Sequence, residues 1–278
     1  ENMGIHPKLL NILNEEINRP DGMVLTTGPT GSGKTTTLYA FLKKVHNPGI
    51  KIITIEDPIE YHLPGIVQTQ VNEKGYNFLE GLRAAVRQDP DIIMVGEIRD
   101  SETANIAINS ALTGHLVFST LHTNDAAGTF PRLIDLGVNS SIIPSALRVS
   151  MAQRLVRILC LNCKKQSMAE GKVKEQIELT LGSIEDKTLI PVEHDKIWLS
   201  VGCEKCNHTG FKGRIGIYEA ILMNEKIEQV IKTNSSDREI WEVAKEQGIL
   251  TMKQDGVLKV LQGITSLEEL ERVIVLQN

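Results

Sequence analysis

Apolar residues in the first half of the chain alternate between short continuous runs and longer segments with helical spacing. The continuous runs cover residues 23–27, 51–55, 92–95 and 116–120, and the helical segments cover residues 8–17, 36–42, 78–87 and 101–112. A short apolar run without polar alternation is typical of a strand that is buried on both faces, as in a parallel sheet. Strands that alternate with helices predict an α/β fold with a parallel-rich sheet.

The turn between the first predicted strand and the helix after it fits the phosphate-binding pattern G-x-x-x-x-G-K-[ST]. Its glycines let the loop curl until several backbone N–H groups point at one anion, and the N-terminal end of the helix adds positive charge. Lys34 would reach the β and γ phosphates of ATP, and Thr35 would bind Mg²⁺. A Gly-rich turn without a ligand is the alternative, which the flanking strand and helix disfavour. The predicted nucleotide-binding residues are Gly28, Pro29, Thr30, Gly31, Ser32, Gly33, Lys34, Thr35 and Thr36.

Carboxylates follow the second predicted strand. Glu56, Asp57 and Glu60 surround Pro58 at the C-terminal end of this strand, where the ligands of α/β sheets bind. We predict that one of these three acids orients or deprotonates the water that attacks ATP, and that the others hold outer-shell waters of Mg²⁺. A solvated acidic turn that begins at Asp-Pro is the alternative.

The strand at residues 92–95 delivers a further acid, Glu97, to the rim of the predicted sheet. This is the place of a Walker B acid, which supports magnesium or catalysis. Gly96 stands where many P-loop proteins have Asp. We therefore predict that Glu97 is the magnesium-side or catalytic carboxylate, and the choice between these roles stays open.

Two histidines bracket the strand at residues 116–120. His122 follows its C-terminal end and is the predicted sensor of the γ-phosphate, whereas His115, at the opposite end, is predicted to be structural or interfacial. Their separation of seven residues would point the two rings to opposite faces of a straight strand.

Composition narrows the class of partner. The chain has 278 residues, a net charge of −5 and 4% aromatic residues, which disfavours a surface built to neutralise phosphates or to stack bases. No apolar run in the sequence approaches the roughly 20 residues that span a bilayer, and no charged-then-apolar signal opens it. We predict a cytoplasmic protein with access to a membrane surface. Because residue 1 is Glu rather than Met, we also predict a piece of a longer protein.

All four cysteines fall into two C-x-x-C pairs, which are Cys160 with Cys163 and Cys203 with Cys206. Two such pairs have the spacing of a tetrahedral Cys₄ zinc site, and a closed shell of four sulfurs makes the predicted Zn²⁺ structural rather than catalytic. Disulfides are disfavoured in a cytoplasmic chain, and thioredoxin-like redox chemistry needs only one pair. The polar connection at residues 164–202 is predicted to form a small subdomain that protrudes from the metal site.

Four motifs in order resemble those of the secretion ATPase superfamily, specifically the extension ATPases of type IV pili and the ATPases of type II secretion. They are the P-loop at residues 28–35, an acidic box at 55–61, an atypical Walker B segment at 82–100 and a histidine box at 113–124. The resemblance implies a RecA-like P-loop fold, a hexameric ring, and ATP hydrolysis that drives the assembly of a pilus or pseudopilus. It also implies that Glu60 polarises the attacking water, that Glu97 supports Mg²⁺, and that His115 and His122 both matter to turnover.

The resemblance also implies the partners and the type of machine. Retraction ATPases of the superfamily typically lack the cysteines, so extension or secretion is favoured. The implied partners are an inner-membrane platform protein and cytoplasmic assembly proteins, and no direct contact with nucleic acid is expected. We predict a motor of type IV pilus assembly that is peripheral to the inner membrane, with type II secretion as the alternative. A nucleic-acid motor and a non-catalytic nucleotide-binding scaffold are the alternatives of other classes.

The predicted domains are an ATPase core at residues 1–158, a zinc subdomain at 159–210, and a hairpin with helices at 211–278. The hairpin is placed at residues 210–219, and the helices are placed at residues 225–232, 237–247, 252–261 and 266–275, where apolar residues have helical spacing. A hairpin or irregular excursion is predicted at residues 62–74. Candidate cations that a neighbouring subunit would supply to the developing γ-phosphate charge are Arg83, Arg87, Arg99 and Arg132.

Overall fold

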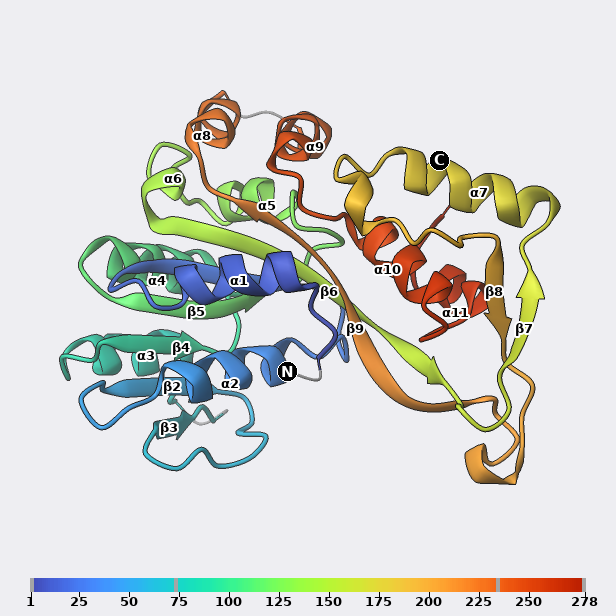
Figure 1. Cartoon of the computed structure of the whole chain (residues 1–278). Helices are drawn as coiled ribbons and strands as arrows, with labels where there is room; N and C mark the ends of the chain where they lie inside the picture. Colours follow the sequence, from blue (N-terminus) through green and yellow to red (C-terminus); the bar gives the residue numbers. More distant parts are fainter. Residues whose placement is uncertain (1–2, 73–74, 234–235, 277–278) are drawn as a thin grey trace. The chain divides into compact units, whose positions relative to one another are not determined.

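The apolar runs of the first half of the chain are parallel strands of one seven-stranded sheet (Figure 1). The computed structural model describes residues 3–72, 75–233 and 236–276. The sheet has the order β3-β2-β4-β5-β1-β6-β9. Its strands are β1 (Gly22–Thr27), β2 (Ile52–Glu56), β3 (Val67–Gln70), β4 (Ile92–Val95), β5 (Leu116–Leu121), β6 (Leu147–Leu159) and β9 (Phe211–Leu222). The pairs β3–β2, β2–β4, β4–β5, β5–β1 and β1–β6 are all parallel.

The described residues form two units. Residues 7–152 and 220–247 make up unit 2, whereas residues 153–219, together with the described residues before 7 and after 247, make up unit 1. The boundary falls within two strands, between Ala152 and Gln153 in β6 and between Glu219 and Ala220 in β9. The predicted division into three domains stays a prediction.

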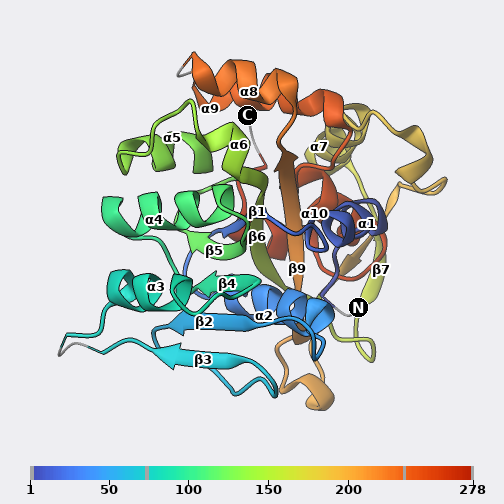
Figure 2. The same cartoon turned by 90° about the vertical axis from the view of Figure 1, so that its left-hand side faces the viewer.

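Helices cover both faces of the sheet in unit 2. Figure 2 shows α2 on one face and α3 and α4 on the other, which accords with contacts of both α2 and α4 with β1 and β5. Side chains at the N-caps define two of the starts, because Asn77 accepts from the N–H of Glu80 at the start of α3 and Asp100 accepts from the N–H of Thr103 at the start of α4. The helices of this unit are α1 (Pro7–Glu16), α2 (Lys34–Val45), α3 (Phe78–Val86), α4 (Ser101–Leu112), α5 (Thr129–Asp135), α6 (Ile143–Ala146), α8 (Glu225–Lys232) and α9 (Asp237–Ala244), with a 3₁₀ turn at Lys245–Gln247.

Unit 1 contains a two-stranded antiparallel ribbon and a group of helices. The ribbon pairs β7 (Lys165–Met168) with β8 (Lys196–Leu199). The helices are α7 (Gly171–Gly182), α10 (Met252–Leu261) and α11 (Leu267–Val273), and 3₁₀ turns lie at Lys187–Leu189 and Glu204–Cys206. Among the residues that the structure describes, no helix is both long and apolar enough to cross a bilayer.

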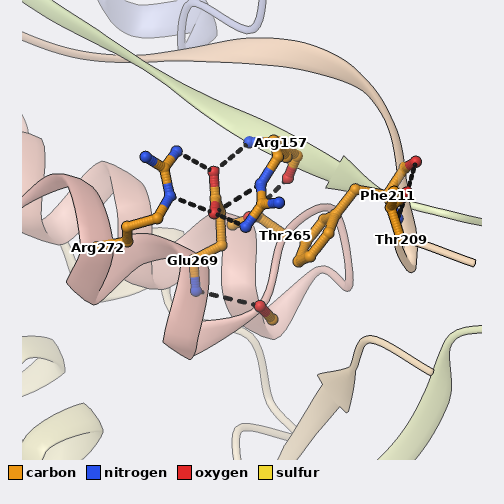
Figure 3. Close-up of polar contacts among 7 residues, drawn as sticks. Arg157, Thr209, Phe211, Thr265, Glu269 and Arg272 are labelled. Atoms are coloured by element: carbon orange, nitrogen blue, oxygen red, sulfur yellow. Dashed lines mark hydrogen bonds and ion pairs between the residues drawn. The ribbon is translucent and has the colours of Figure 1, made fainter. Parts of the chain in front are cut away.

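A buried carboxylate joins α11 to the strands of unit 1 (Figure 3). The fully buried side chain of Glu269 accepts hydrogen bonds from the backbone N–H and the guanidinium of Arg157, at 2.9, 2.9 and 2.6 Å, and from the guanidinium of Arg272 at 2.8 and 2.7 Å. The guanidinium of Arg157 also lies 4.1 Å from the ring centroid of Phe211. One acid therefore fixes the relative position of β6, β9 and α11 in this unit.

Most of the predicted elements are confirmed, with helices observed at the predicted residues 101–112, 225–232 and 252–261. The hairpin predicted at residues 210–219 is wrong, since these residues belong to the single strand β9. A Cβ at Gly216 would lie 2.3 Å from the ring of Tyr218, so this glycine makes room for an aromatic side chain on the same face of the strand. It does not mark a turn.

Of the hairpin or irregular excursion predicted at residues 62–74, the described part contains one strand, β3, which pairs in parallel with β2 and not with a second strand of its own segment. The prediction at residues 73–74 falls outside the described residues. Two parallel strands of the sheet, β3 and β6, thus lie outside the four strands predicted from the apolar runs.

We predict that Glu269→Gln destabilises the protein by about 1–3 kcal/mol at pH 7, because it weakens the charged hydrogen bonds to two half-exposed guanidinium groups. The measurement is the free energy of unfolding in urea. Glu228→Gln is the matched control, since it removes a carboxylate from an exposed pair with Lys232 and should cost less than about 1 kcal/mol. Similar losses in the two variants would contradict this account of Glu269.

The same carboxylate predicts a pH dependence. Burial alone would raise the pKa of Glu269, but the hydrogen bonds from Arg272 and Arg157 outweigh it and lower the pKa from 4.5 to about 2. A lowered pKa stabilises the folded state above the unfolded value and loses this contribution as the pH falls from 4.5 towards 2. The difference in unfolding free energy between the wild type and Glu269→Gln should therefore shrink over that window. If this difference in unfolding free energy stays constant from pH 4.5 to pH 2, the lowered pKa of Glu269 is refuted.

Candidate functional site

The register of the parallel strands brings four loops to one edge of the sheet in unit 2. Thr27 at the end of β1 pairs with Leu121 at the end of β5, and Val95 at the end of β4 pairs with Ser119 in β5 and with Ile55 in β2. The segments that follow β1, β2, β4 and β5 therefore start at the same edge, which is where ligands of open α/β sheets bind. These segments contain the P-loop and the predicted acids and histidine.

The loop after β1 has the conformation of a phosphate-binding loop. Gly33 is the N-cap of α2 and has a φ of 90°, in the left-handed region that residues with a Cβ avoid, and no side chain caps the helix there. The first backbone N–H groups of α2 are thus available to an anion. The ammonium of Lys34 donates to the carbonyls of Gly28 at 2.9 Å and Pro29 at 3.2 Å, so its side chain folds over the loop.

Lys34 and Glu97 are electrostatically coupled. Burial lowers the pKa of the Lys34 ammonium, and the negative charge of Glu97 opposes this shift. Thr35 is half-buried beside Lys34, whereas Pro29, Thr30, Gly31 and Thr36 are exposed. The predicted P-loop residues thus present both a buried cation and an exposed loop backbone.

Glu97 is the centre of a charged group that joins the loops after β4 and β5. Its carboxylate contacts the guanidinium of Arg99, and its other oxygen lies 3.3 Å from Nε2 of the half-exposed His122. The structure therefore brings together three of the predicted site residues, namely Lys34, Glu97 and His122. Their roles stay predictions.

The glycine before Glu97 is explained by the sheet. Gly96 donates its N–H to the carbonyl of Ile55 at 2.7 Å, and a Cβ added to it would lie 3.2 Å from that oxygen and 3.3 Å from the ring of Phe78. Such contacts are tighter than ordinary van der Waals contact, so an Asp at position 96 would require its neighbours to shift by a few tenths of an ångström.

The remaining predicted residues differ in their surroundings. Glu56 is fully buried and accepts hydrogen bonds from Tyr39, Thr54 and Gln68, whereas Glu60 is exposed in the loop after β2. His115 lies at the start of β5, at the opposite end from His122, and its Nδ1 is 3.0 Å from the carbonyl oxygen of Ser110. The sequence predicted this separation of the two histidines.

The four cysteines form one cluster in unit 1. Their sulfur atoms all lie within 4.8 Å of one another, and the closest pairs are Cys160–Cys203 at 3.9 Å, Cys163–Cys206 at 3.8 Å and Cys203–Cys206 at 3.8 Å. A tetrahedral zinc with Zn–S bonds of about 2.3 Å places its sulfurs about 3.8 Å apart, whereas a disulfide needs about 2.05 Å. The cluster therefore has the dimensions of a Cys₄ zinc site.

Backbone N–H groups around the cluster favour the thiolate form of Cys206, whereas burial and the neighbouring thiols raise the pKa of Cys163 to about 11. The N–H of Cys203 and of Gly210 donate to the sulfur of Cys206 at 3.2 and 3.3 Å, and the N–H of Gly202 donates to the sulfur of Cys163 at 3.3 Å. Burial alone would raise the pKa of Cys206, but these donors and the neighbouring thiols lower it to about 6. Thiolates are the form in which cysteine binds zinc.

Sequence reasoning missed two residues of this region and gave a third another partner. Arg99 was a candidate cation for a neighbouring subunit, yet it contacts Glu97 of its own chain, and the pattern Glu-x-Arg after a strand was the available signal. Tyr39 and Gln68 lie on α2 and β3, far apart in the sequence, and both contact Glu56. No local pattern marks them.

A parallel-rich sheet with a glycine-rich loop between an interior strand and a helix, and with acids after the neighbouring strands, defines the P-loop class of nucleotide-binding folds. The predicted α/β fold of this class is confirmed. Residues 1–272 match the family described as "Type II/IV secretion system protein", and the chain belongs to this family.

Relatives in this family come from two kinds of machine. The chain is 48% identical to a "Type II secretion system protein E" of Aeromonas hydrophila, over 95% of this chain and 50% of the relative. It is 46% identical to a "Type IV pilus assembly ATPase PilB" of Thermus thermophilus, over 97% of this chain and 30% of the relative. The chain thus spans about half the length of the first relative and under a third of the second.

A solved structure, of the pilus retraction motor PilT with bound ADP, is similar in fold and sequence. It has a TM-score of 0.69 and 30% identity, and the match covers 96% of this chain and 64% of that one. The similarity includes nearly the whole chain and so extends beyond the sheet of unit 2.

We predict that the purified protein binds one zinc per chain through the cysteine cluster. Cys203→Ser should lose the zinc and lower the melting temperature, because a metal that binds only the folded state adds its binding free energy to stability. Zinc content by elemental analysis and melting by circular dichroism are the measurements.

Leu161→Ala is the matched control for this prediction. Leu161 lies between Cys160 and Cys163 but is 79% exposed, so its replacement should leave both the zinc and the melting temperature unchanged. A wild type with well under one metal per chain and four reactive thiols would exclude the zinc site.

Proposed function

We propose that this chain is the catalytic part of a Mg²⁺-dependent ATPase that powers the assembly of a type IV pilus at the inner membrane. The observation that carries the proposal is the convergence of Lys34, Glu97 and His122 beside the P-loop, from three different strand ends. Membership in a family that includes a pilus assembly ATPase supports it.

The residues of this edge would divide the chemistry among them. The loop N–H groups and Lys34 would hold the β and γ phosphates, which a compact ammonium suits as a point charge. Thr35 and Glu97 would hold Mg²⁺, and Glu60 would polarise the attacking water. His122 is in contact with Glu97 and would report the presence of the γ-phosphate to the loop after β5.

The other chemical groups would be structural or would couple the site to its partners. The zinc bound by the cysteine cluster would hold the two C-x-x-C pairs together. Four sulfur ligands leave no open position for a substrate, so this zinc would be structural. His115 would act at the far end of β5, in structure or at an interface. The motor would work as a hexameric ring in the cytoplasm, peripheral to the membrane, with an inner-membrane platform protein and cytoplasmic assembly proteins as partners.

Type II secretion is the second candidate, and the relative at 48% identity from Aeromonas hydrophila favours it. The chemistry of the site would be the same, because both machines would use ATP to extrude a filament. The choice is tested in the organism, where a Lys34→Ala allele should abolish surface pili in the first case and the export of secreted enzymes in the second.

We predict that the complete natural protein releases phosphate from ATP only with Mg²⁺. Lys34→Ala should abolish nucleotide binding, and Glu60→Gln and Glu97→Gln should each lower turnover by about a hundredfold or more while sparing binding. Turnover by phosphate release and affinity for a fluorescent ATP analogue are the measurements.

Glu15→Gln is the matched control, because it removes an exposed carboxylate from α1 and should leave turnover unchanged. A non-catalytic scaffold would show no Mg²⁺-dependent turnover in the wild type. A nucleic-acid motor would instead bind DNA or RNA with an affinity that falls linearly in log salt.

A further inference from the structure

The loop that carries Glu60 is held by its backbone on both sides of this residue. The N–H of Ile59 donates to the side-chain oxygen of Gln70 at 3.1 Å, and the carbonyl of Tyr61 accepts from Nε2 of Gln68 at 3.2 Å. Glu60 itself is exposed. Its backbone is therefore fixed to β3, while its carboxylate stays accessible to a reacting molecule.

A tyrosine of the P-loop helix contacts the same loop. Tyr39 is fully buried on α2, its ring packs edge-on against the ring of Tyr61 with centroids 4.7 Å apart, and its hydroxyl accepts from Nε2 of Gln68 at 3.3 Å. Its hydroxyl also donates to the carboxylate of Glu56. The hydroxyl of Tyr39 thus joins α2 to β2 and β3, and its ring packs on the loop at Tyr61.

Glu56 fixes the direction of that hydroxyl. Its carboxylate is 1% exposed and also accepts from the hydroxyl of Thr54 and from Nε2 of Gln68, the latter at 3.1 Å. A buried carboxylate that is saturated with donors is costly to displace, so it holds its partners in place. We therefore assign Glu56 to the support of this loop rather than to contact with the water.

We propose that Tyr39 is a positioning residue that sets the place of Glu60 relative to the phosphate-binding loop. Tyr39 lies five residues after Lys34 in the same helix, so its hydroxyl is rigidly related to the ammonium that would grip the phosphates. Through Glu56 and Gln68 it fixes the backbone of Glu60 to that frame. An error of about 1 Å in the position of a reacting group can cost about a hundredfold in rate.

The inference rests on the proposed function, because the position of Glu60 affects turnover only if Glu60 acts on the attacking water. Tyr39→Phe removes the hydroxyl and keeps the ring that packs on Tyr61. We expect turnover of the complete natural protein to fall about ten- to a hundredfold, while the affinity for an ATP analogue changes less than about threefold.

Tyr218→Phe is the matched control, since it removes a hydroxyl that bonds to the carbonyl of Met3 within unit 1. Tyr218→Phe should leave turnover unchanged. This result would show that a loss of turnover in Tyr39→Phe comes from that hydroxyl and not from the loss of a tyrosine hydroxyl in general. Unchanged turnover in Tyr39→Phe, or a loss of affinity as large as the loss of turnover, would overturn the inference.

A cycle with Glu60→Gln tests whether Tyr39 acts through Glu60. If it does, Tyr39→Phe should lower single-turnover hydrolysis in the wild-type background and change it less than about twofold in the Glu60→Gln background. A purely structural tyrosine would lower both equally, and that result would refute the role in positioning. Should Tyr39→Phe fail to fold, Gln68→Met takes its place in the same cycle, because it removes the bonds to Tyr61 and Glu56.

The two proposals fail in different ways. If Glu60→Gln hydrolyses ATP at the wild-type rate, the proposed role of Glu60 is wrong, whatever Tyr39→Phe does. If Glu60→Gln is inactive and Tyr39→Phe is fully active, the ATPase stands and only the positioning role is wrong.

Discussion

The parallel, in-register pairing of β1, β5, β4 and β2 is the constraint on which the candidate site depends. Each loop of the site follows one of these strands, so the distance between two loops is set by how their strands align. Side-chain hydrogen bonds secure this alignment at the strand ends, since Ser119 donates to the carbonyl of Val95 at 2.7 Å and Thr120 donates to that of Gly96 at 2.8 Å. A slip of one residue would turn every side chain of a strand to the other face and break these bonds.

Gly96 shows how closely the strands and the site are linked. Its lack of a side chain lets β4 approach β2, and the same approach decides which residue after β4 can be an acid. The residue that precedes Glu97 is therefore also a packing contact between β4 and β2.

The sequence predicted best those features whose signal is local. The P-loop, the two C-x-x-C pairs and the capped helix at residues 101–112 each depend on residues that are close in the chain, and the structure has them where they were expected. The ends of the buried strands were also predictable, because apolar runs end at carboxylates or histidines. These ends were sufficient to place Glu97 and His122 at one edge of the sheet.

Features that depend on distant partners were not predictable. The contacts of Tyr39 with Glu56 and Gln68 join a helix and two strands, and β3 lacks the apolar run that marks its neighbours because much of it is exposed. The strand β9 was mistaken for a hairpin since glycine usually signals a turn, whereas Gly216 accommodates the ring of Tyr218. Only the packed structure distinguishes these two uses of glycine.

The division of the described residues into two units has a practical consequence for spectroscopy. The chain contains two tryptophans, and Trp198 belongs to unit 1 whereas Trp241 belongs to unit 2. The indole of Trp198 lies 4.5 Å from the ammonium of Lys164, a cationic neighbour within its own unit. Intrinsic fluorescence can therefore follow each unit separately once the other indole is replaced by phenylalanine, and the protein carries its own optical reporters of whether the two halves melt together.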